Sequence, residues 1–162
     1  MTLVQDGQAQ AVLVISAEAA DVAPEQKKQG RRDVVPSPHA PERLAAREIQ
    51  DHVRRMSGAT LEIVRAGQDL GGRKPVYLGT AAPASLEEAI RAKGRDPSAF
   101  ALVVGAESIS IRGLSAEGTL FGAYELLEQL GVRWFLPGEL GLVVPEARTV
   151  TVKTQRTIAV PS

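Results

Sequence analysis

The 162-residue sequence contains no cysteine and no asparagine, and its charges balance. Without cysteine the chain can form no disulfide, thiolate nucleophile or zinc–thiolate site. Without asparagine it has no N-glycosylation sequon. Its 19 basic and 19 acidic residues give a formal net charge of zero. Because nucleic-acid-binding proteins concentrate basic residues on one face or segment, this balance predicts no nucleic-acid partner.

Long apolar runs are missing as well. The most apolar stretch, residues 11–17, is far shorter than the roughly 20 residues that cross a bilayer, so we expect no membrane partner. A signal peptide would carry positive charge before this stretch, and the preceding segment carries none. Residues 11–15 are instead typical of a buried strand. The localisation stays open, with a secreted or periplasmic parent protein as one option.

Residues that often carry out chemistry are few. The two histidines, His39 and His52, are thirteen positions apart, which excludes a His-Glu-x-x-His zinc site. We interpret His52 as a packed or half-exposed helix residue. Neither a Gly-x-Ser-x-Gly elbow nor a Gly-x-Gly-x-x-Gly fingerprint is present. The sequence therefore predicts no metal and no cofactor.

Pairs of acidic residues leave one catalytic function open, that of a glycosidase. A glycosidase needs two carboxylates about 5–9 Å apart across a sugar cleft. Glu125 and Glu128 share one face of a predicted helix, and Glu87 and Glu88 are neighbours in a shorter one. Nothing in the pattern marks a cleft, so we interpret both pairs as solvated helix faces. We expect no catalytic residue in this chain.

Apolar spacing predicts two main helices and a short one. The first begins at Pro41 and runs to Ser57, with Gly58 as its stop. Its apolar stripe comprises Leu44, Ala45, Ile49, Val53 and Met56. A short helix is predicted over 84–93, with Ser85 as its N-cap and Gly94 as its stop.

The second main helix is predicted over 115–130, followed by Gly131. Gly118 and Gly122 lie four residues apart on one face of it, which predicts close approach of the helix backbone to a sheet. An anion site at the start of this helix is the alternative, which Glu117 disfavours.

Short β-branched runs punctuated by glycine and proline predict the strands. Besides 11–15, they comprise 60–64, 75–78, 100–104, 108–112, 132–136, 141–144 and 149–153. The short link 105–107 predicts a hairpin. The fold class is thus α/β (α+β): a single two-layer domain with a mixed sheet and two main helices on one face. Spacing does not predict the strand order.

Two segments carry open alternatives. Residues 18–40 include a basic cluster of Lys27, Lys28, Arg31 and Arg32, which is either part of a solvated loop or a patch for phosphate or an acidic partner. Farther on, Arg133-Trp134-Phe135 precedes Leu136-Pro137. Trp134 could stack on a sugar while Arg133 binds a carboxylate, or Trp134 could cover a sheet edge or a neighbouring domain.

Two blocks carry a family resemblance. Residues 111–138, followed by Val143-Val144-Pro145, resemble the N-terminal domain that precedes the catalytic barrel in α-glucuronidases and family 20 β-N-acetylhexosaminidases. Residues 42–60, with their Met-Ser-Gly turn, are similar to the family's first helix. The version in uncharacterised bacterial glycosidase-like proteins is the most similar, and the resemblance covers about residues 10–153.

The resemblance implies an accessory domain at 10–153, a tail at 1–9, and a second tail or linker to a missing domain at 154–162. The family's catalytic carboxylates lie on a downstream (β/α)8 barrel, which needs about 250 residues, so no catalytic residue is carried over to this chain. The ending at 158–162 favours an excised domain over a stand-alone protein.

The leading hypothesis is a non-catalytic accessory domain of a glycoside-hydrolase-like protein, with the parent's barrel as its partner. Trp134 and Leu140 are then expected to be exposed on an interdomain surface within 133–142. The alternative is a small carbohydrate-binding module that uses Trp134 and Arg133. A chain that is itself a glycosidase is the third, least favoured possibility.

Overall fold

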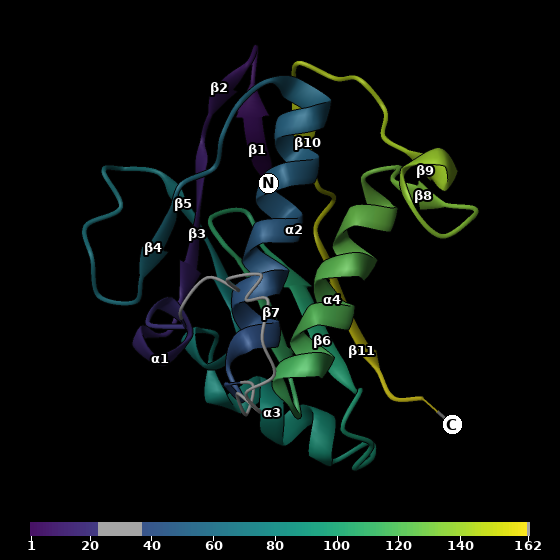
Figure 1. The fold of residues 1–162 in the computed structure, drawn as a ribbon. Helices are drawn as coiled ribbons and strands as arrows, with labels where there is room; N and C mark the ends of the chain where they lie inside the picture. The colour runs from purple at the N-terminus through teal and green to yellow at the C-terminus, as the bar shows by residue number, and fades with distance from the viewer. Residues whose placement is uncertain (23–36, 162) are drawn as a thin grey trace, which may run out of the picture.

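A six-stranded mixed sheet forms the centre of the molecule in a computed structural model that describes residues 1–22 and 37–161 (Figure 1). Its strands, in spatial order, are β11 (Gln155–Ala159), β6 (Phe100–Val104), β7 (Ile109–Gly113), β5 (Lys74–Leu78), β3 (Ala11–Ile15) and β4 (Ile63–Arg65). From β7 to β4 all neighbours are parallel, whereas β6 is antiparallel to both β7 and β11. The mixed sheet and the β6–β7 hairpin are confirmed. The basic cluster of Lys27, Lys28, Arg31 and Arg32 lies outside the described residues.

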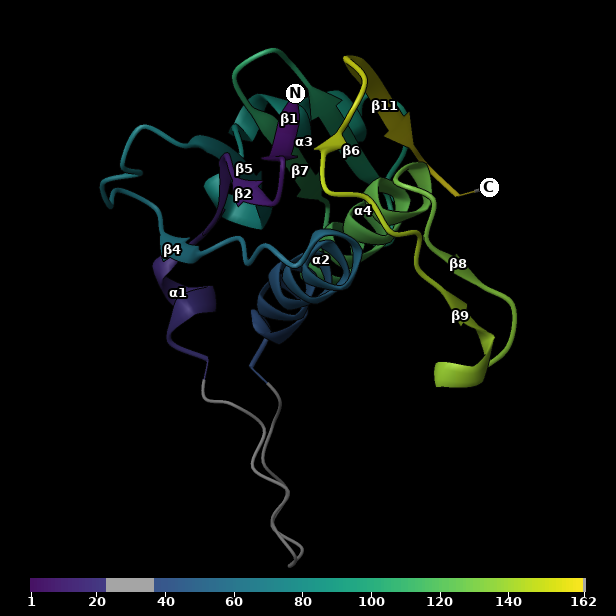
Figure 2. The ribbon, with the colours of Figure 1, turned by 90° about the horizontal axis from the view of Figure 1, so that it is seen from above.

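Two long helices, α2 (Ala40–Ser57) and α4 (Ala116–Gln129), pack side by side on one face of this sheet (Figure 2). Gly58 ends α2 in the left-handed conformation, with φ of 77°. The main core lies between this helix layer and alternate residues of the strands, such as Leu13, Phe100 and Leu102. The predicted architecture of two main helices on one face is therefore confirmed.

The other two helices are short. Helix α3 (Ala84–Arg91) packs through Leu86 and Ile90 on Ala101, which points to the face away from the main core. A four-residue helix, α1 (Ala17–Ala20), follows β3 and begins at Ser16, whose hydroxyl accepts a hydrogen bond from the Ala19 N–H. Short 3-10 turns, η1 (Gly79–Ala81) and η2 (Glu139–Gly141), complete the helical elements.

Several short strands lie outside the central sheet. A second sheet joins β10 (Val150–Thr151), β1 (Thr2–Gln5) and β2 (Gln8–Ala9), and a two-stranded ribbon joins β8 (Arg133–Trp134) to β9 (Leu142–Val143). Strands β1 and β2 lie within 1–9, where the sequence predicted a tail, and β11 lies within 154–162, where it predicted a tail or the start of a linker. These strands were missed because they are short or largely polar, and because β1 and β11 pair with β10 and β6, which are distant in the chain.

Two local predictions were wrong. Leu44 is 41% exposed and does not belong to the buried stripe of α2. The buried face of α2 is formed by Ala45, Ala46 and Ile49, and Leu44 lies on the solvent side of this face. Ser85 lies inside α3 and does not cap it, because the helix begins one residue earlier, with Pro83 at the N-cap position.

Glycines bring α4 close to the sheet, as predicted. A Cβ at Gly118 would lie 2.6 Å from the carbonyl oxygen of Ala99. A Cβ at Gly122 would lie 2.5 Å from Cγ2 of Ile111. The side chain of Ser115 caps the helix and accepts a hydrogen bond from the Gly118 N–H. A helix backbone therefore lies directly against strand-end backbone and side chains at these positions.

We expect Gly118→Ala to lower the free energy of unfolding by up to about 2 kcal/mol. Alanine gains about 1 kcal/mol of helix propensity, but overpacking against a backbone carbonyl that cannot move aside costs about 1–3 kcal/mol. Urea denaturation followed by circular dichroism measures the change. Gly105→Ala is the matched control, since its Cβ would meet nothing closer than 3.5 Å. A more stable Gly118→Ala variant would show that the backbones are not in contact.

Candidate functional site

The strongest concentration of exposed apolar side chains is on a small lobe, residues 133–143, which contains β8, η2 and β9. Figures 1 and 2 show that the lobe stands away from the body of the domain, beside the C-terminal ends of α2 and α4. Its most exposed large side chains, with their exposed fractions, are Leu140 (100%), Phe135 (71%), Leu136 (64%), Val143 (50%) and Trp134 (39%). Single exposed apolar residues are ordinary, but a contiguous group of them marks an interaction surface.

Two glycines and the β8–β9 pairing determine the path of the backbone through the lobe. Gly131, with φ of 98°, ends α4 and turns the chain toward β8. In the β8–β9 ribbon Trp134 lies opposite Leu142. Beyond the ribbon the Phe135 N–H donates to the Gly141 carbonyl at 2.8 Å. A Cβ at Gly141 would collide with the Leu136 backbone, so only glycine allows this close turn.

Two sets of contacts attach the lobe to the helix layer. Arg55, in the last turn of α2, forms a bidentate ion pair with Glu139, each N–O distance being 3.0 Å. Hydrogen bonding to Arg55 lowers the pKa of the Glu139 carboxyl. The Trp134 ring lies edge-on to His52 of α2 and Tyr124 of α4, with centroid separations of 5.6 and 5.5 Å. The orientation of the lobe thus depends on both long helices.

The sequence singled out Trp134 and Leu140, and both are exposed on this lobe. Their role as an interdomain surface stays a prediction. Phe135 and Leu136 were missed, because the sequence predicted a strand over 132–136 in which alternate residues would be buried. The strand ends at Trp134, and the next two side chains both face solvent.

Arg133 is engaged within the chain. Its guanidinium donates to the carbonyl oxygens of Glu128 at 2.5 Å and Val132 at 2.7 Å. The Glu128 carbonyl lies in the last turn of α4, where a positive charge is favourable, and Val132 lies just beyond the helix. Arg133 therefore bonds to the chain at and just beyond the end of α4, and its role as a ligand residue beside Trp134 stays a prediction.

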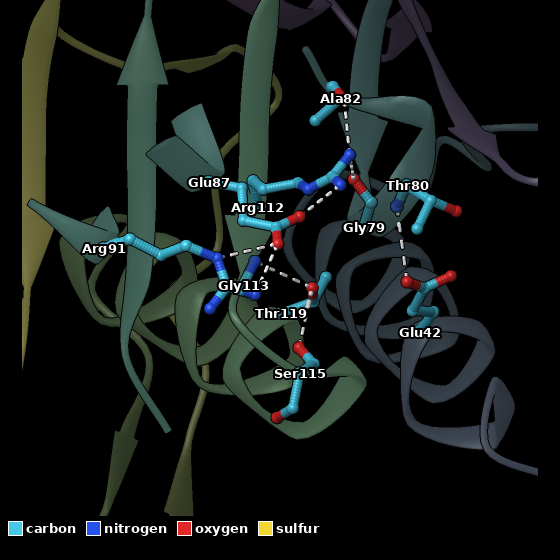
Figure 3. A network of polar contacts seen from close by, with 10 residues as sticks. All are labelled: Glu42, Gly79, Thr80, Ala82, Glu87, Arg91, Arg112, Gly113, Ser115 and Thr119. Atoms are coloured by element: carbon cyan, nitrogen blue, oxygen red, sulfur yellow. Dashed lines mark hydrogen bonds and ion pairs between the residues drawn. The ribbon is translucent and has the colours of Figure 1, made fainter. Parts of the chain in front are cut away.

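A second candidate site lies at the opposite end of the helices, near the carboxyl ends of β5 and β7, where open α/β sheets usually bind ligands. Figure 3 shows its polar network. Arg112 donates to the Ala82 carbonyl at 2.9 Å and to the Glu87 carboxylate at 2.6 Å, and Glu87 also accepts from Arg91 at 2.8 Å. Hydrogen bonds from Arg112 and then Arg91 lower the pKa of Glu87. The network fixes α3 to the sheet.

Glu42, in the first turn of α2, is the other carboxylate at this end (Figure 3). It accepts a hydrogen bond from the Thr80 N–H at 3.3 Å and one from the Ser16 hydroxyl at 3.4 Å. Burial raises its pKa. Nδ1 of His39 lies 3.8 Å from its Oε2.

The cavity that Glu42 and Glu87 both line measures about 160 Å³. Ligand pockets usually measure about 300–1,000 Å³, so this space is small for a sugar. Glu87 is also held by two arginines. The arrangement is that of a buried polar network which joins the helix layer to the sheet, and it does not present two free carboxylates to a substrate.

The remaining candidates lie apart from this end. Glu125 and Glu128 line a groove of about 450 Å³ together with Phe121, Tyr124 and Trp134. His52 is buried, as predicted. Among residues 1–22 and 37–161 no group of three or more metal-ligating side chains is arranged to hold an ion. In the same part of the chain no helix has the length and hydropathy of a membrane span.

Comparison with known proteins shows a likeness of fold. No family model and no curated protein matches the chain. Over 94% of its length the structure is similar to part of a GH115 4-O-methyl-α-glucuronidase, BtGH115A, that has specificity for decorated arabinogalactans, with 17% identity and a TM-score of 0.58. The chain spans only 18% of that glucuronidase chain.

Two further likenesses have TM-scores of 0.42. One is to a GH138 enzyme targeting pectin rhamnogalacturonan II, at 12% identity over 75% of this chain and 13% of the enzyme. The other is to an inactive mutant of a GH20 exo-β-N-acetylglucosaminidase from Vibrio harveyi, at 18% identity over 80% of this chain and 14% of the enzyme.

The two carboxylates of the polar network have pKa shifts of opposite sign, so we expect Glu42→Gln and Glu87→Gln to change the pH dependence of stability in opposite ways. The raised pKa of Glu42 means that the folded state holds a proton above the ordinary value of 4.5, so stability is lost as pH rises through the raised pKa. Relative to the parent chain, Glu42→Gln should therefore gain stability as pH rises above 4.5.

The lowered pKa of Glu87 contributes stability that is present above 4.5 and is lost as pH falls through the lowered pKa. Glu87→Gln should therefore be less stable than the parent chain at neutral pH, with a difference that narrows on acidification. Urea denaturation of both variants from about pH 2.5, below the ordinary carboxyl pKa, to about pH 7 measures this. Parallel pH profiles for the two variants would contradict the assignment.

Proposed function

We propose that this chain is a non-catalytic accessory domain of a glycoside-hydrolase-like protein and that it docks through the lobe on a larger catalytic part, a (β/α)8 barrel. The observation that carries the proposal is the lobe itself. It holds four side chains that are half-exposed or more, on a hydrogen-bonded ribbon that points away from the domain core. The likeness of fold to a minor portion of an α-glucuronidase chain supports the choice of parent.

Burial energetics favour a protein-covered lobe. Covering a fully exposed leucine or phenylalanine contributes about 1.5–3 kcal/mol per side chain. Leu140 and Phe135 contribute little to the stability of the domain where they lie, since both are largely in water. Their contribution becomes available when another surface covers them, as at the apolar centre of an interface.

The arrangement of the carboxylates favours an accessory role over catalysis. Glycoside hydrolysis needs one carboxylic acid and one carboxylate on opposite sides of a glycosidic bond. Here Glu87 is held by Arg112 and Arg91, and Glu42 is buried against Thr80 and Ser16. We expect the chain alone to give no turnover on aryl glycosides, and bond cleavage would then belong to the barrel.

The double variant Phe135→Ser, Leu140→Ser tests the proposal. We expect its free energy of unfolding to stay within about 0.5 kcal/mol of the parent, because both side chains are exposed. Its affinity for the separately expressed barrel encoded next to this domain should fall at least about tenfold, which corresponds to about 1.4 kcal/mol in binding. Isothermal titration calorimetry measures the affinity of the barrel for the parent chain and for the double variant.

Leu44→Ser is the matched control, because Leu44 is an exposed leucine at the other end of α2. It makes the same apolar-to-polar change and should leave the affinity unchanged. Equal affinity for the parent chain and the double variant would overturn docking through the lobe. A gene that encodes no barrel beside this domain would overturn the accessory role.

A further inference from the structure

A cavity of about 400 Å³ lies between α2 and the lobe, next to the apolar side chains described above. Its lining residues are Glu48, Asp51, His52, Arg55, Trp134, Gly138, Glu139 and Leu142. This volume is within the range of ordinary ligand pockets. The cavity opens beside the surface that the proposed function assigns to a partner, so a group on that partner can enter it.

One nitrogen in the lining of this cavity has no hydrogen-bond partner. His52 is only 6% exposed, and its Nε2 is a buried atom without a partner among the described residues. Its Nδ1 lies 2.7 Å from the Glu48 carbonyl oxygen, on its own helix. Because a carbonyl oxygen only accepts, Nδ1 must donate in this bond, and in the neutral ring Nε2 is then an acceptor. Buried acceptors are generally paired with a donor, and the described residues supply none to Nε2.

Carboxylates dominate the charge around the same space. Glu48, Asp51 and Glu139 line the cavity, together with one guanidinium, that of Arg55, which is already paired to Glu139. On the other side of Trp134, the 450 Å³ groove adds Glu125 and Glu128. Within the described part of the chain, no lysine or arginine forms an ion pair with Glu48, Asp51, Glu125 or Glu128. The chain as a whole has equal numbers of acidic and basic residues, so this excess is local.

We propose that the cavity receives an arginine side chain from the protein surface that covers the lobe. A guanidinium supplies an N–H donor to Nε2 of His52, a positive charge between Glu48 and Asp51, and a flat cation that can lie over the Trp134 ring. Its five donors can meet acceptors on several sides at once, which the compact ammonium of lysine does less well. A carboxylate ligand would be repelled, and an aliphatic side chain would leave Nε2 without a donor.

This inference rests on the proposed function, because the arginine belongs to the domain that docks on the lobe. It adds a directional polar contact, which fixes how the two surfaces are aligned. The apolar side chains Phe135, Leu136 and Leu140 supply burial without direction, whereas a single arginine between fixed acceptors allows only one placement.

A peptide titration tests the inference on the intact chain. The probes are acetyl-Gly-Arg-Gly-amide, its citrulline analogue, which is neutral but has nearly the same shape, its lysine analogue, and methyl glucuronide. Trp134 is the only tryptophan, so its emission reports on the cavity without interference. We expect saturable binding of the arginine peptide, at least tenfold weaker binding of the citrulline peptide, intermediate binding of the lysine peptide and none of the glucuronide.

Variants locate the site. Asp51→Asn removes one carboxylate from the cavity at an exposed position, so it should fold normally and weaken the arginine peptide severalfold. Glu88→Gln is the control, since it makes the same charge change at an exposed position on α3, outside both grooves. The long-range ¹⁵N shift of His52 Nε2 should change on binding in the parent chain.

The inference would be overturned if the arginine peptide bound no more tightly than the citrulline peptide. Preferential binding of the glucuronide would also overturn it. The proposed function fails in a different way. If the lobe variant Phe135→Ser, Leu140→Ser binds the barrel normally, docking through the lobe is wrong whatever the peptides show. If docking needs the lobe but the peptides do not bind, only the arginine site is wrong.

Discussion

The contact between α4 and the strand ends of the sheet determines where the rest of the helix layer lies. Gly113, Gly118 and Gly122 leave no room for a Cβ, so the α4 backbone lies directly on β6, β7 and the segment before β6. Helix α2 packs along α4, and Trp134 then contacts one ring from each helix, His52 and Tyr124. A shift of α4 away from the sheet would therefore separate the two rings that hold the lobe.

The sequence predicted the elements that have strong local signals. Helix α2 has a clear apolar stripe and a left-handed glycine at its end, and the β6–β7 hairpin joins two β-branched runs through the four residues 105–108. Strands β1 and β11 have no such signal. Strand β1 pairs with β10, nearly 150 residues away, and β11 is a partly exposed edge strand with polar residues at Gln155 and Arg156. Their existence depends on partners that the local pattern does not contain.

The candidate surface was predicted only in part, because some of its features depend on contacts between distant parts of the chain. Trp134 and Leu140 stand out in the sequence as large apolar residues between glycine and proline, and both are exposed. The role of Arg133 could not be seen, because it depends on where the last carbonyls of α4 lie. The cavity at His52 was also invisible, since it joins α2 to a segment more than 80 residues later, and only the folded chain shows that Nε2 lacks a donor.

The two ends of the helix layer differ in how much apolar surface they expose, and this difference supports a division of roles. At the carboxyl ends of β5 and β7, where open α/β sheets usually bind ligands, Arg112 bonds to Glu87 and to the Ala82 carbonyl, and Glu42 accepts from the Thr80 N–H. At the other end, beyond the last turn of α2, Leu140 lies in water, and Nε2 of His52 is buried without a donor. A closed hydrogen-bond network stabilises a fold by itself. Exposed apolar atoms and unpaired polar atoms become stabilising only when another surface covers the former or bonds to the latter. The end that lacks partners is therefore the end at which this domain has most to gain from binding.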